Sequence, residues 1–243
     1  MARRAVRVIG PGRAGLSLLA AFDKAGWRAL PPLGRGDDIS DAAADADLLL
    51  ITTPDGAVAD VAAAIEPVPS CVVAHVSGSL TLDVLAPHAR RASLHPLRAL
   101  PTTSSDVTGA WFAVAGDPLV AEAAADLGGR VVEVADTAEA RSAYHAAAVV
   151  ASNHLVALLD SVERIAAVAG VPLDAFLDLV RGTVDNVEVM GPERALTGPV
   201  ARGDWDTVER HLEAIPSGER ATYMKLAEAA ARLAGRAGEV PWP

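Results

Sequence analysis

The chain has 243 residues, enough for one large or two modest domains, and 51% of them are hydrophobic, as in a globular protein. A balance of 21 Lys and Arg against 31 Asp and Glu gives a formal net charge of -10, so no general basic field would attract nucleic acid or an anionic membrane. The single cysteine, Cys71, excludes an internal disulfide framework and is expected to be buried. Since no run of roughly 18 apolar residues is present, we expect a soluble, cytoplasmic protein.

Residues 6–21 contain an apolar strand, three glycines with the spacing G-x-G-x-x-G, and an Ala/Leu-rich helical pattern. This is the context of a dinucleotide-binding turn. Gly10 permits the sharp turn, Gly12 leaves room for a pyrophosphate, and Gly15 lets the helix lie close to the sheet. Backbone N–H groups of the first helical turn, which begins at Arg13 and Ala14, then face the phosphates. The stretch predicts NAD(P) binding, with a ligand-free glycine turn as the alternative.

The choice of cofactor depends on the turn after the second strand, expected at 27–30. An acid in this turn would bind the ribose hydroxyls of NAD, whereas an arginine would bind the 2′-phosphate of NADP. Arg35 comes first, and a guanidinium matches phosphate geometry. We therefore expect NADP, while Asp37 and Asp38 keep NAD possible and a solvated charged turn remains the non-functional interpretation.

Strands and helices alternate over the first half of the chain. Further strands are expected within 47–55 and at 72–76, 92–95, 111–115 and 130–134, separated by helices at 56–66, 80–85 and 118–127. This alternation predicts an α/β fold with a doubly wound parallel Rossmann sheet. Ligands of such sheets lie at the carboxyl ends of the strands, so four residues are expected to line the cofactor cleft: Thr52, Pro54, Ser77 and Gly78.

From Thr137 onward the pattern is helical, with segments at 137–169, 173–190, 204–214 and 217–236. We therefore predict an NAD(P)-binding domain over 1–136 and an all-α substrate and dimerisation domain over 137–243. The first helix has more apolar surface than three shorter helices are expected to cover, and its alanines allow close approach. A homodimer is expected.

Several polar residues are candidates for chemistry. His145 and Asn153 are eight residues apart in the long helix, so α-helical periodicity returns them to nearly one face. His145 could act as a general acid and Asn153 could orient a carbonyl or the nicotinamide. Either could equally be a buried polar group that a neighbouring helix satisfies.

Other candidates follow outside the long helix. Arg202, with Thr197, lies in a Gly/Pro-rich loop before a helix that Asp204 can cap. It is interpreted as an anchor for a substrate carboxylate or, alternatively, as an arginine that caps a helix C-terminus or pairs with Asp204. Asn186, near the end of the 173–190 helix, is also counted as a catalytic candidate. His95 ends a strand at the cleft and faces either cofactor or solvent.

The remaining histidines carry no predicted function. His75 is expected in the core, and His88 and His211 on the surface. No histidine pair has metal-ligand spacing with a cysteine or an acid, so no metal is expected.

Several stretches of the sequence together resemble one known family: Ile9–Gly15, Ser77–Gly78, Leu94–Leu97, Tyr144–His145, Ser152–Asn153, Ala195–Pro199 and Ala201–Asp204. The chain resembles a family of Rossmann-like proteins of largely uncharacterised function, with a second domain of the 6-phosphogluconate dehydrogenase C-terminal type. The wider superfamily includes ketopantoate reductase, pyrroline-5-carboxylate reductase, prephenate dehydrogenase and β-hydroxyacid dehydrogenases. The resemblance implies hydride transfer with NAD(P) and usually an intertwined dimer.

One departure concerns the proton donor. Ketopantoate reductases and β-hydroxyacid dehydrogenases use a lysine near the start of the long helix, but Lys24 and Lys225 are the only lysines here. His145 takes about that place. We expect NADP-dependent, ketopantoate-reductase-like hydride transfer to a small carboxylate-bearing carbonyl or imine. The alternatives are a prephenate-type dehydrogenase, suggested by His95-Pro96, and a non-catalytic NADP(H)-binding sensor, suggested by the missing lysine.

Overall fold

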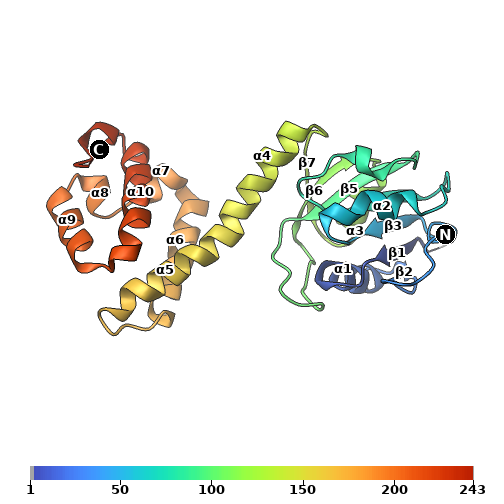
Figure 1. Cartoon of the computed structure of the whole chain (residues 1–243), viewed down its shortest axis with the longest axis horizontal. Coiled ribbons are helices and arrows are strands. Elements are labelled where there is room, and N and C mark those ends of the chain that lie inside the picture. Colours follow the sequence, from blue (N-terminus) through green and yellow to red (C-terminus); the bar gives the residue numbers. More distant parts are fainter. Residues whose placement is uncertain (1–2, 243) are drawn as a thin grey trace. The chain divides into compact units, whose positions relative to one another are not determined.

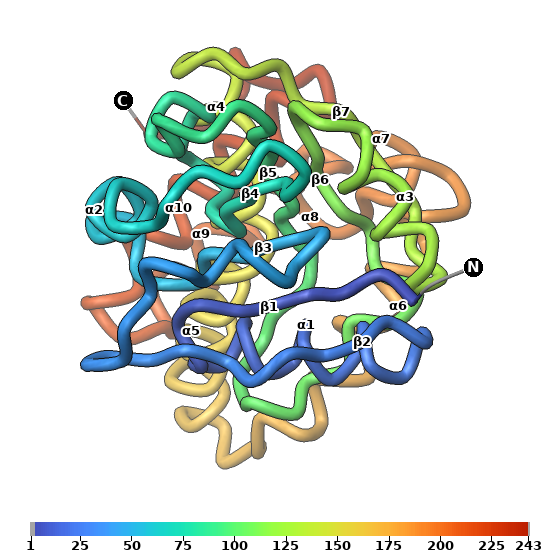
Figure 2. The backbone as a smooth tube through the Cα atoms, turned by 90° about the vertical axis from the view of Figure 1, so that its right-hand side faces the viewer, coloured from blue at the N-terminus to red at the C-terminus, as the bar shows by residue number. Residues whose placement is uncertain are grey.

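The computed structural model describes residues 3–242, which divide into two compact units between Ser152 and Asn153 (Figure 1). In the first unit, seven strands form one sheet in the order β2-β1-β3-β4-β5-β6-β7. Figure 2 shows β1 between β2 and β3. The strands are β1 (Ala5–Ile9), β2 (Arg28–Ala29), β3 (Leu48–Ile51), β4 (Val72–His75), β5 (Arg91–Pro96), β6 (Trp111–Gly116) and β7 (Arg130–Glu133).

The expected α/β class with a Rossmann-like sheet is confirmed, but the sheet is not wholly parallel. All neighbouring strands run parallel except β5 and β6, whose Leu94 pairs with Val114 in antiparallel register. The loop between these two strands contains no helix in the structure. The chain therefore returns directly beside β5 in the antiparallel direction, without a helical crossover.

The inner strands are apolar without interruption because both faces of the sheet are covered. In β3, Leu48 and Leu50 pack into the core with α1 (Arg13–Lys24) and α3 (Leu119–Asp126), while Leu49 and Ile51 pack into the core with α2 (Val58–Ala63). Alternating side chains thus serve two cores.

The predicted helices after β3 and β4 are shorter than expected. The first starts as a 3-10 turn, η1 (Asp55–Ala57), and the second is only the 3-10 turn η2 (Leu82–Leu85). His88, expected on the surface, is buried because its Nε2 lies 2.9 Å from the Ala62 carbonyl oxygen. Cys71 and His75 are buried as predicted.

The long helical segment is confirmed, but it is not α-helical throughout. It consists of α4 (Ala138–Val149), a π-helical turn η3 (Val150–His154) and α5 (Leu155–Ala167). Thr137 caps α4 by accepting a hydrogen bond from the Ala140 N–H. The first compact unit extends to Ser152 and so includes all of α4, whereas the predicted boundary lies at the start of that helix. A domain boundary at Thr137 stays a prediction.

The second unit is helical in the part that the structure describes. Val200, Val208, Ala227 and Ala231 form its small core. The loop expected around Arg202 instead contains two one-turn helices, each with a proline at its start after a glycine of positive φ. After α5, its helices are α6 (Asp174–Met190), α7 (Pro192–Ala195), α8 (Pro199–Arg202), α9 (Trp205–Ala214), α10 (Ser217–Leu233) and the 3-10 turn η4 (Ala237–Glu239).

Candidate functional site

The glycine-rich turn joins β1 to α1 at the carboxyl edge of the sheet. Gly10 has φ +97°, and a Cβ there would lie 2.9 Å from the Thr53 nitrogen. A Cβ at Gly15 would overlap the Gly10 carbonyl oxygen. Both glycines are therefore required by the packing of the chain itself.

Gly12 differs from them because no atom lies within 4 Å of its Cβ position. It precedes α1 without a side-chain cap, and the N–H groups of Arg13, Ala14 and Gly15 have no hydrogen-bond partner among residues 3–242. The chain leaves an open space in front of unpaired donors at the positive end of a helix, an arrangement that fits a pyrophosphate.

The end of β3 supports this turn. The Thr52 hydroxyl donates to the Gly10 carbonyl oxygen at 2.6 Å and lies 3.1 Å from that of Ile9. Thr52 was predicted to bind the cofactor, and its hydroxyl is engaged with the turn. Thr53 Oγ1 is buried without a hydrogen-bond partner in the described chain, and Pro54 is exposed where η1 begins.

The turn with Arg35 lies beside the glycine-rich turn. The Gly10 N–H donates to the Leu33 carbonyl oxygen at 2.8 Å. Asp37 accepts from the Gly34 N–H at 2.7 Å and Asp38 accepts from Ser40, so both acids shape the turn. Arg35 is exposed, and no hydrogen bond or ion pair of its side chain occurs within the described part of the chain.

The turn after β4 is held from one side by a carboxylate. Ser77 and Ser79 donate to Asp55 Oδ2 at 2.7 and 3.0 Å. The Ser77 hydroxyl also accepts from the N–H groups of Ser79 and Leu80. These bonds fix the backbone of Gly78, which is buried.

Arg141 holds the same turn from α4. This side chain is fully buried, and its guanidinium donates to the carbonyl oxygens of Leu80 at 2.9 Å and Ser77 at 3.2 Å and to the Ser93 hydroxyl at 2.5 Å. Tyr144 and His145 follow at i+3 and i+4, on the same helix face. One face of α4 therefore packs against the carboxyl ends of β4 and β5.

Two imidazoles meet where Gly78 has no side chain. A Cβ at Gly78 would lie 2.5 Å from His145 Nδ1, 3.2 Å from His95 Cε1 and 3.3 Å from His95 Nε2. His95 Nδ1 lies 2.5 Å from the Tyr144 hydroxyl, and the His95 and His145 ring centroids are 6.2 Å apart. The structure thus brings His95, His145 and Gly78 together.

The surroundings make His95 a weak base. Burial is the largest cause that lowers its pKa to about 4, and the charges of His145 and Arg141 add to the effect. Burial also raises the pKa of Tyr144 to about 12. Both groups are therefore neutral near pH 7.

The other predicted catalytic residues belong to the second unit. Asn153, Asn186, Thr197 and Arg202 are all exposed, and Arg202 ends α8. Asp204 caps α9 through the Thr207 N–H, as predicted. Asn153 lies in the π-helical turn, so the α-helical spacing that was expected to align it with His145 does not continue to it.

Arg141, Ser93 and Tyr144 are not among the site residues that the sequence predicts. A spacing signal was present, because Arg141, Tyr144 and His145 share one face of an Ala-rich helix. Their partners, Ser77, Ser93 and His95, are distant in sequence, and only the fold brings them near.

Comparisons with known proteins agree with this architecture. A Rossmann-like domain model matches residues 28–101, and a model described as a domain of unknown function, DUF2520, matches residues 111–230. No curated protein matches the sequence at a significant level.

Solved structures share the fold. A Bacteroides fragilis protein, provisionally described as an NADP oxidoreductase, has TM-score 0.77 and 20% identity over 95% of this chain and 98% of its own. A Thermotoga maritima protein has TM-score 0.70 and 24% identity over 95% and 98%. A reductive aminase from Aspergillus terreus, in complex with NADPH and ethyl levulinate, has TM-score 0.60 and 18% identity over 98% and 90%.

The two family models follow one another along the chain and together match most of it, in the order that the fold also displays. The chain therefore matches a Rossmann-like domain followed by a DUF2520 domain.

Proposed function

We propose that this protein is an NADP-dependent oxidoreductase acting on a small carbonyl or imine substrate. The observation that carries the proposal is the glycine-rich turn: the Gly12 position is open, and the first N–H groups of α1 are unpaired. Structural neighbours described as an NADP oxidoreductase and as a reductive aminase with NADPH support the same class of reaction.

The preference for NADP over NAD rests on the turn after β2. Asp37 and Asp38 each use one carboxylate oxygen in a hydrogen bond that shapes the turn, whereas Arg35 has no such local role. Arg35 is exposed and unpaired within residues 3–242, which leaves its guanidinium available for a 2′-phosphate.

When bound, the nicotinamide would supply or accept the hydride. A carbonyl or imine carbon that gains a hydride passes an electron pair to its oxygen or nitrogen, which then takes a proton. His145 holds that proton in our proposal. Its Nδ1 is buried against Gly78, so Nε2 is the ring atom that a substrate can reach. General acid catalysis contributes about 10²–10⁴-fold in rate.

The substrate is proposed to carry a carboxylate. A protein of net charge -10 needs a local cation to hold an anion, and Arg202 is exposed, with Thr197 nearby in sequence as a hydroxyl donor. Asn153 and Asn186 stay candidates for orienting the substrate. A ketopantoate-like acid and a carboxylate-bearing imine both meet this description.

Titration of NADPH and NADH into the full-length protein tests the cofactor. Hydrogen bonds to charged groups contribute about 1.5–3 kcal/mol, so Arg35→Ala is expected to weaken NADPH binding about 10- to 100-fold and to leave NADH binding nearly unchanged. Arg28→Ala is the matched control. Arg28 is also exposed, but it begins β2 and pairs with Ala5 at the amino ends of the strands, whereas the Arg35 turn follows their carboxyl ends. Equal affinities in the wild type would contradict the choice of NADP, and binding of neither cofactor would overturn the proposal.

Turnover separates an enzyme from a non-catalytic NADPH-binding module, the alternative that the missing helix lysine favours. Loss of NADPH absorbance is followed with a panel of 2-oxo acids and cyclic imines, and its appearance is followed with NADP⁺ and prephenate, which would donate the hydride. Consumption with an oxo acid or imine supports the proposed function. Bound NADPH that stays unchanged with every member supports the sensor.

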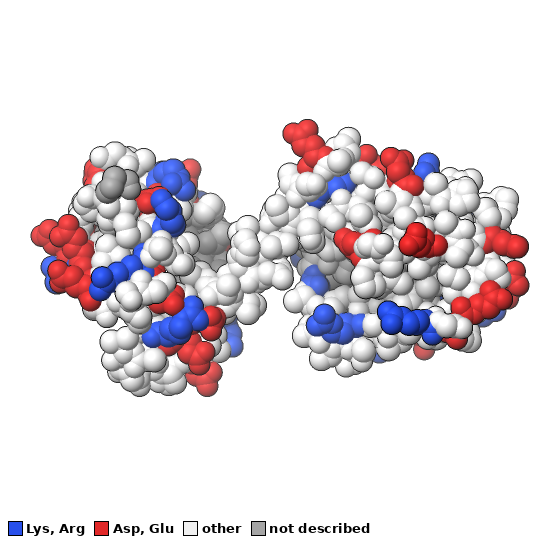
Figure 3. Space-filling view, in the orientation of Figure 1, with Lys and Arg blue, Asp and Glu red and all other residues white. Residues whose placement is uncertain are grey.

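A homodimer in the cytoplasm is part of the same proposal. The helix Ala138–Ala167 has mean hydropathy 1.2 over its most apolar window and, by length and composition alone, could cross a membrane. No charged residue lies between Arg141 and Asp160, and this stretch is an uncharged surface in Figure 3. In α6, none of the 17 residues is buried, and Leu179, Val184 and Val189 are more than half exposed. A second copy of the chain would cover these apolar helices.

A further inference from the structure

Tyr144 is placed to decide which nitrogen of His95 carries the proton. Its hydroxyl lies 2.5 Å from His95 Nδ1, and the two rings meet edge to face at a centroid distance of 5.6 Å. The bond has two possible directions. Either the phenol donates to Nδ1 and the ring proton sits on Nε2, or Nδ1–H donates to the phenol oxygen.

The hydrogen-bond inventory favours donation by the phenol. The Tyr144 hydroxyl has no second partner within residues 3–242, so if it accepted from Nδ1–H its own proton would lack a protein acceptor. A phenol is also the stronger donor of the two, and a neutral imidazole nitrogen the stronger acceptor. The phenol can donate and Nδ1 can accept only when the His95 proton is on Nε2.

The other nitrogen of His95 faces the Gly78 end of the site. Nε2 has no hydrogen-bond partner among the described residues and, unlike His145 Nδ1, is not an enclosed atom. An N–H at Nε2 therefore makes no hydrogen bond within the described residues and can donate one to a ligand.

The charges around His95 keep the ring neutral. Burial is the largest effect that opposes protonation of His95. The neighbouring His145 and Arg141 from α4 and His75 from β4 act in the same direction, while Asp55 from η1 acts against them. The ring is then a neutral donor rather than an acid.

We propose that Tyr144 is a positioning residue that fixes the Nε2–H tautomer of His95, so that neutral His95 donates a hydrogen bond to the oxygen or nitrogen of the substrate. This rests on the proposed function and adds a second donor to it. His145 supplies the proton, while His95 stabilises negative charge as it develops on the heteroatom and keeps its own proton.

The chain supplies a matched control. Tyr223 and His211 repeat the pair in the second unit, with the hydroxyl 2.7 Å from Nδ1 and ring centroids 6.0 Å apart. Tyr223 is the only other tyrosine in the sequence. Tyr144→Phe and Tyr223→Phe each remove one hydroxyl from such a pair and preserve the ring.

The first measurement needs no substrate. Two-bond ¹H–¹⁵N correlation spectra of ¹⁵N-histidine-labelled full-length protein report which ring nitrogen is protonated, and the His95 signals are assigned by their loss in His95→Gln. We expect Nε2–H in the wild type, a shift toward mixed tautomers in Tyr144→Phe, and an unchanged His95 in Tyr223→Phe. A wild-type His95 with its proton on Nδ1 overturns the inference, whatever the activity.

The second measurement is turnover with whichever panel substrate the wild type consumes. Tyr144→Phe is expected to lower kcat about tenfold, the scale of one neutral hydrogen bond, with NADPH affinity and KM nearly unchanged. Unaltered kcat overturns the donor role of His95. A wild type that binds NADPH but consumes no substrate overturns the proposed reaction instead, and the NMR result then decides the role of Tyr144.

Discussion

At the scale of single residues, Gly78 shows how a missing side chain creates the site. His145 Nδ1 lies 2.5 Å from its Cβ position, closer than real Cβ contacts come, and two atoms of His95 lie just beyond 3 Å. Any other residue here would displace an imidazole. The glycine has no positive φ, so its requirement comes from the neighbouring rings and not from its own backbone.

His75 provides a prediction about acid sensitivity. Burial, followed by the charge of Arg141, lowers its pKa to about 4 from an ordinary value of 6.5. The unfolded chain therefore binds a proton at this residue before the folded chain does, and stability falls as pH drops from about 6.5 toward 4. From pH 7 to pH 5, His75 is expected to remove about 2 kcal/mol from the free energy of unfolding.

Urea unfolding at the two pH values checks this expectation. His75→Leu should lose clearly less stability than the wild type between pH 7 and pH 5, because it leaves no buried base to protonate. His211→Leu is the control, since His211 is exposed and should retain the wild-type dependence. Identical pH dependences in His75→Leu and the wild type would disprove the assignment.

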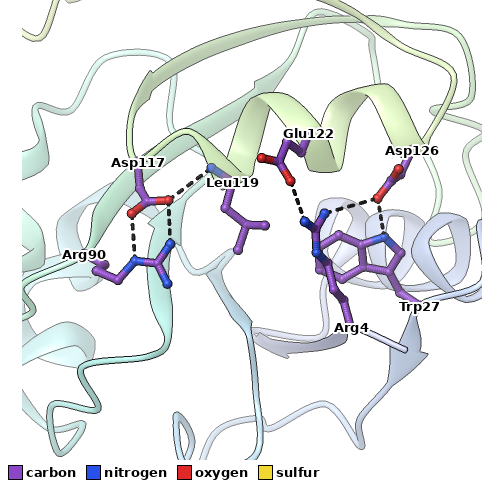
Figure 4. A network of polar contacts seen from close by, with 7 residues as sticks. All are labelled: Arg4, Trp27, Arg90, Asp117, Leu119, Glu122 and Asp126. Carbon is purple, nitrogen blue, oxygen red and sulfur yellow. Dashed lines mark hydrogen bonds and ion pairs between the residues drawn. The ribbon is translucent and has the colours of Figure 1, made fainter. Parts of the chain in front are cut away.

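At the scale of elements, ion pairs attach α3 to the rest of the first unit (Figure 4). Asp117 accepts from Arg90 Nε at 2.8 Å and Nη2 at 3.0 Å, and from the Leu119 N–H at the start of α3. At the other end of α3, Arg4 and Trp27 contact Asp126. Arg90, just before β5, and Arg4, just before β1, thereby connect these two strands to α3.

Asp117→Asn is expected to destabilise the protein by about 1–2 kcal/mol, since it weakens a charged, two-bond interaction whose arginine is partly exposed. Burial alone would raise the pKa of Asp117, but the bonds from Arg90 and Leu119 outweigh it and lower the pKa. The advantage of the wild type is therefore present above pH 4 and disappears as the pH falls further.

Denaturant unfolding at pH 7 and pH 3 measures this difference. Glu122→Gln is the comparison, because Glu122 pairs with Arg4 on an exposed surface and should contribute less than about 0.5 kcal/mol. A wild-type-like Asp117→Asn at pH 7 would show that the pair does not stabilise α3.

At the scale of the whole molecule, light scattering tests the proposed homodimer. One chain has a mass of 24.9 kDa, so we expect a particle of twice that mass at micromolar concentration without detergent. Val184→Asp places a charge on the apolar surface of α6 and should shift the mass toward one chain. Leu226→Asp, also at an exposed apolar position but in α10, should not.

Two results would contradict the dimer. A wild-type protein of monomer mass would mean that no second copy covers the apolar helices. Recovery only in detergent would mean that lipid covers the Ala138–Ala167 helix instead.

The sequence by itself determined the glycine-rich half of the candidate site. The glycine-rich turn and the Arg35 turn are local features, for which glycine spacing and flanking apolar runs suffice to predict a turn. The continuous apolar strands likewise predicted a sheet that is covered on both faces, because only burial on both sides favours such runs.

Only the tertiary structure decided the rest. The antiparallel pairing of β5 and β6 depends on a connecting loop that forms no helix. The burial of His88 depends on its contact with the Ala62 carbonyl oxygen, 26 residues away. The imidazole pair needs Gly78, His95 and α4 to meet across the sheet edge, and the bonds of Arg141 join residues 48–64 positions apart. No local pattern encodes such contacts, because the partners are far apart in the sequence and lie together only in the folded sheet.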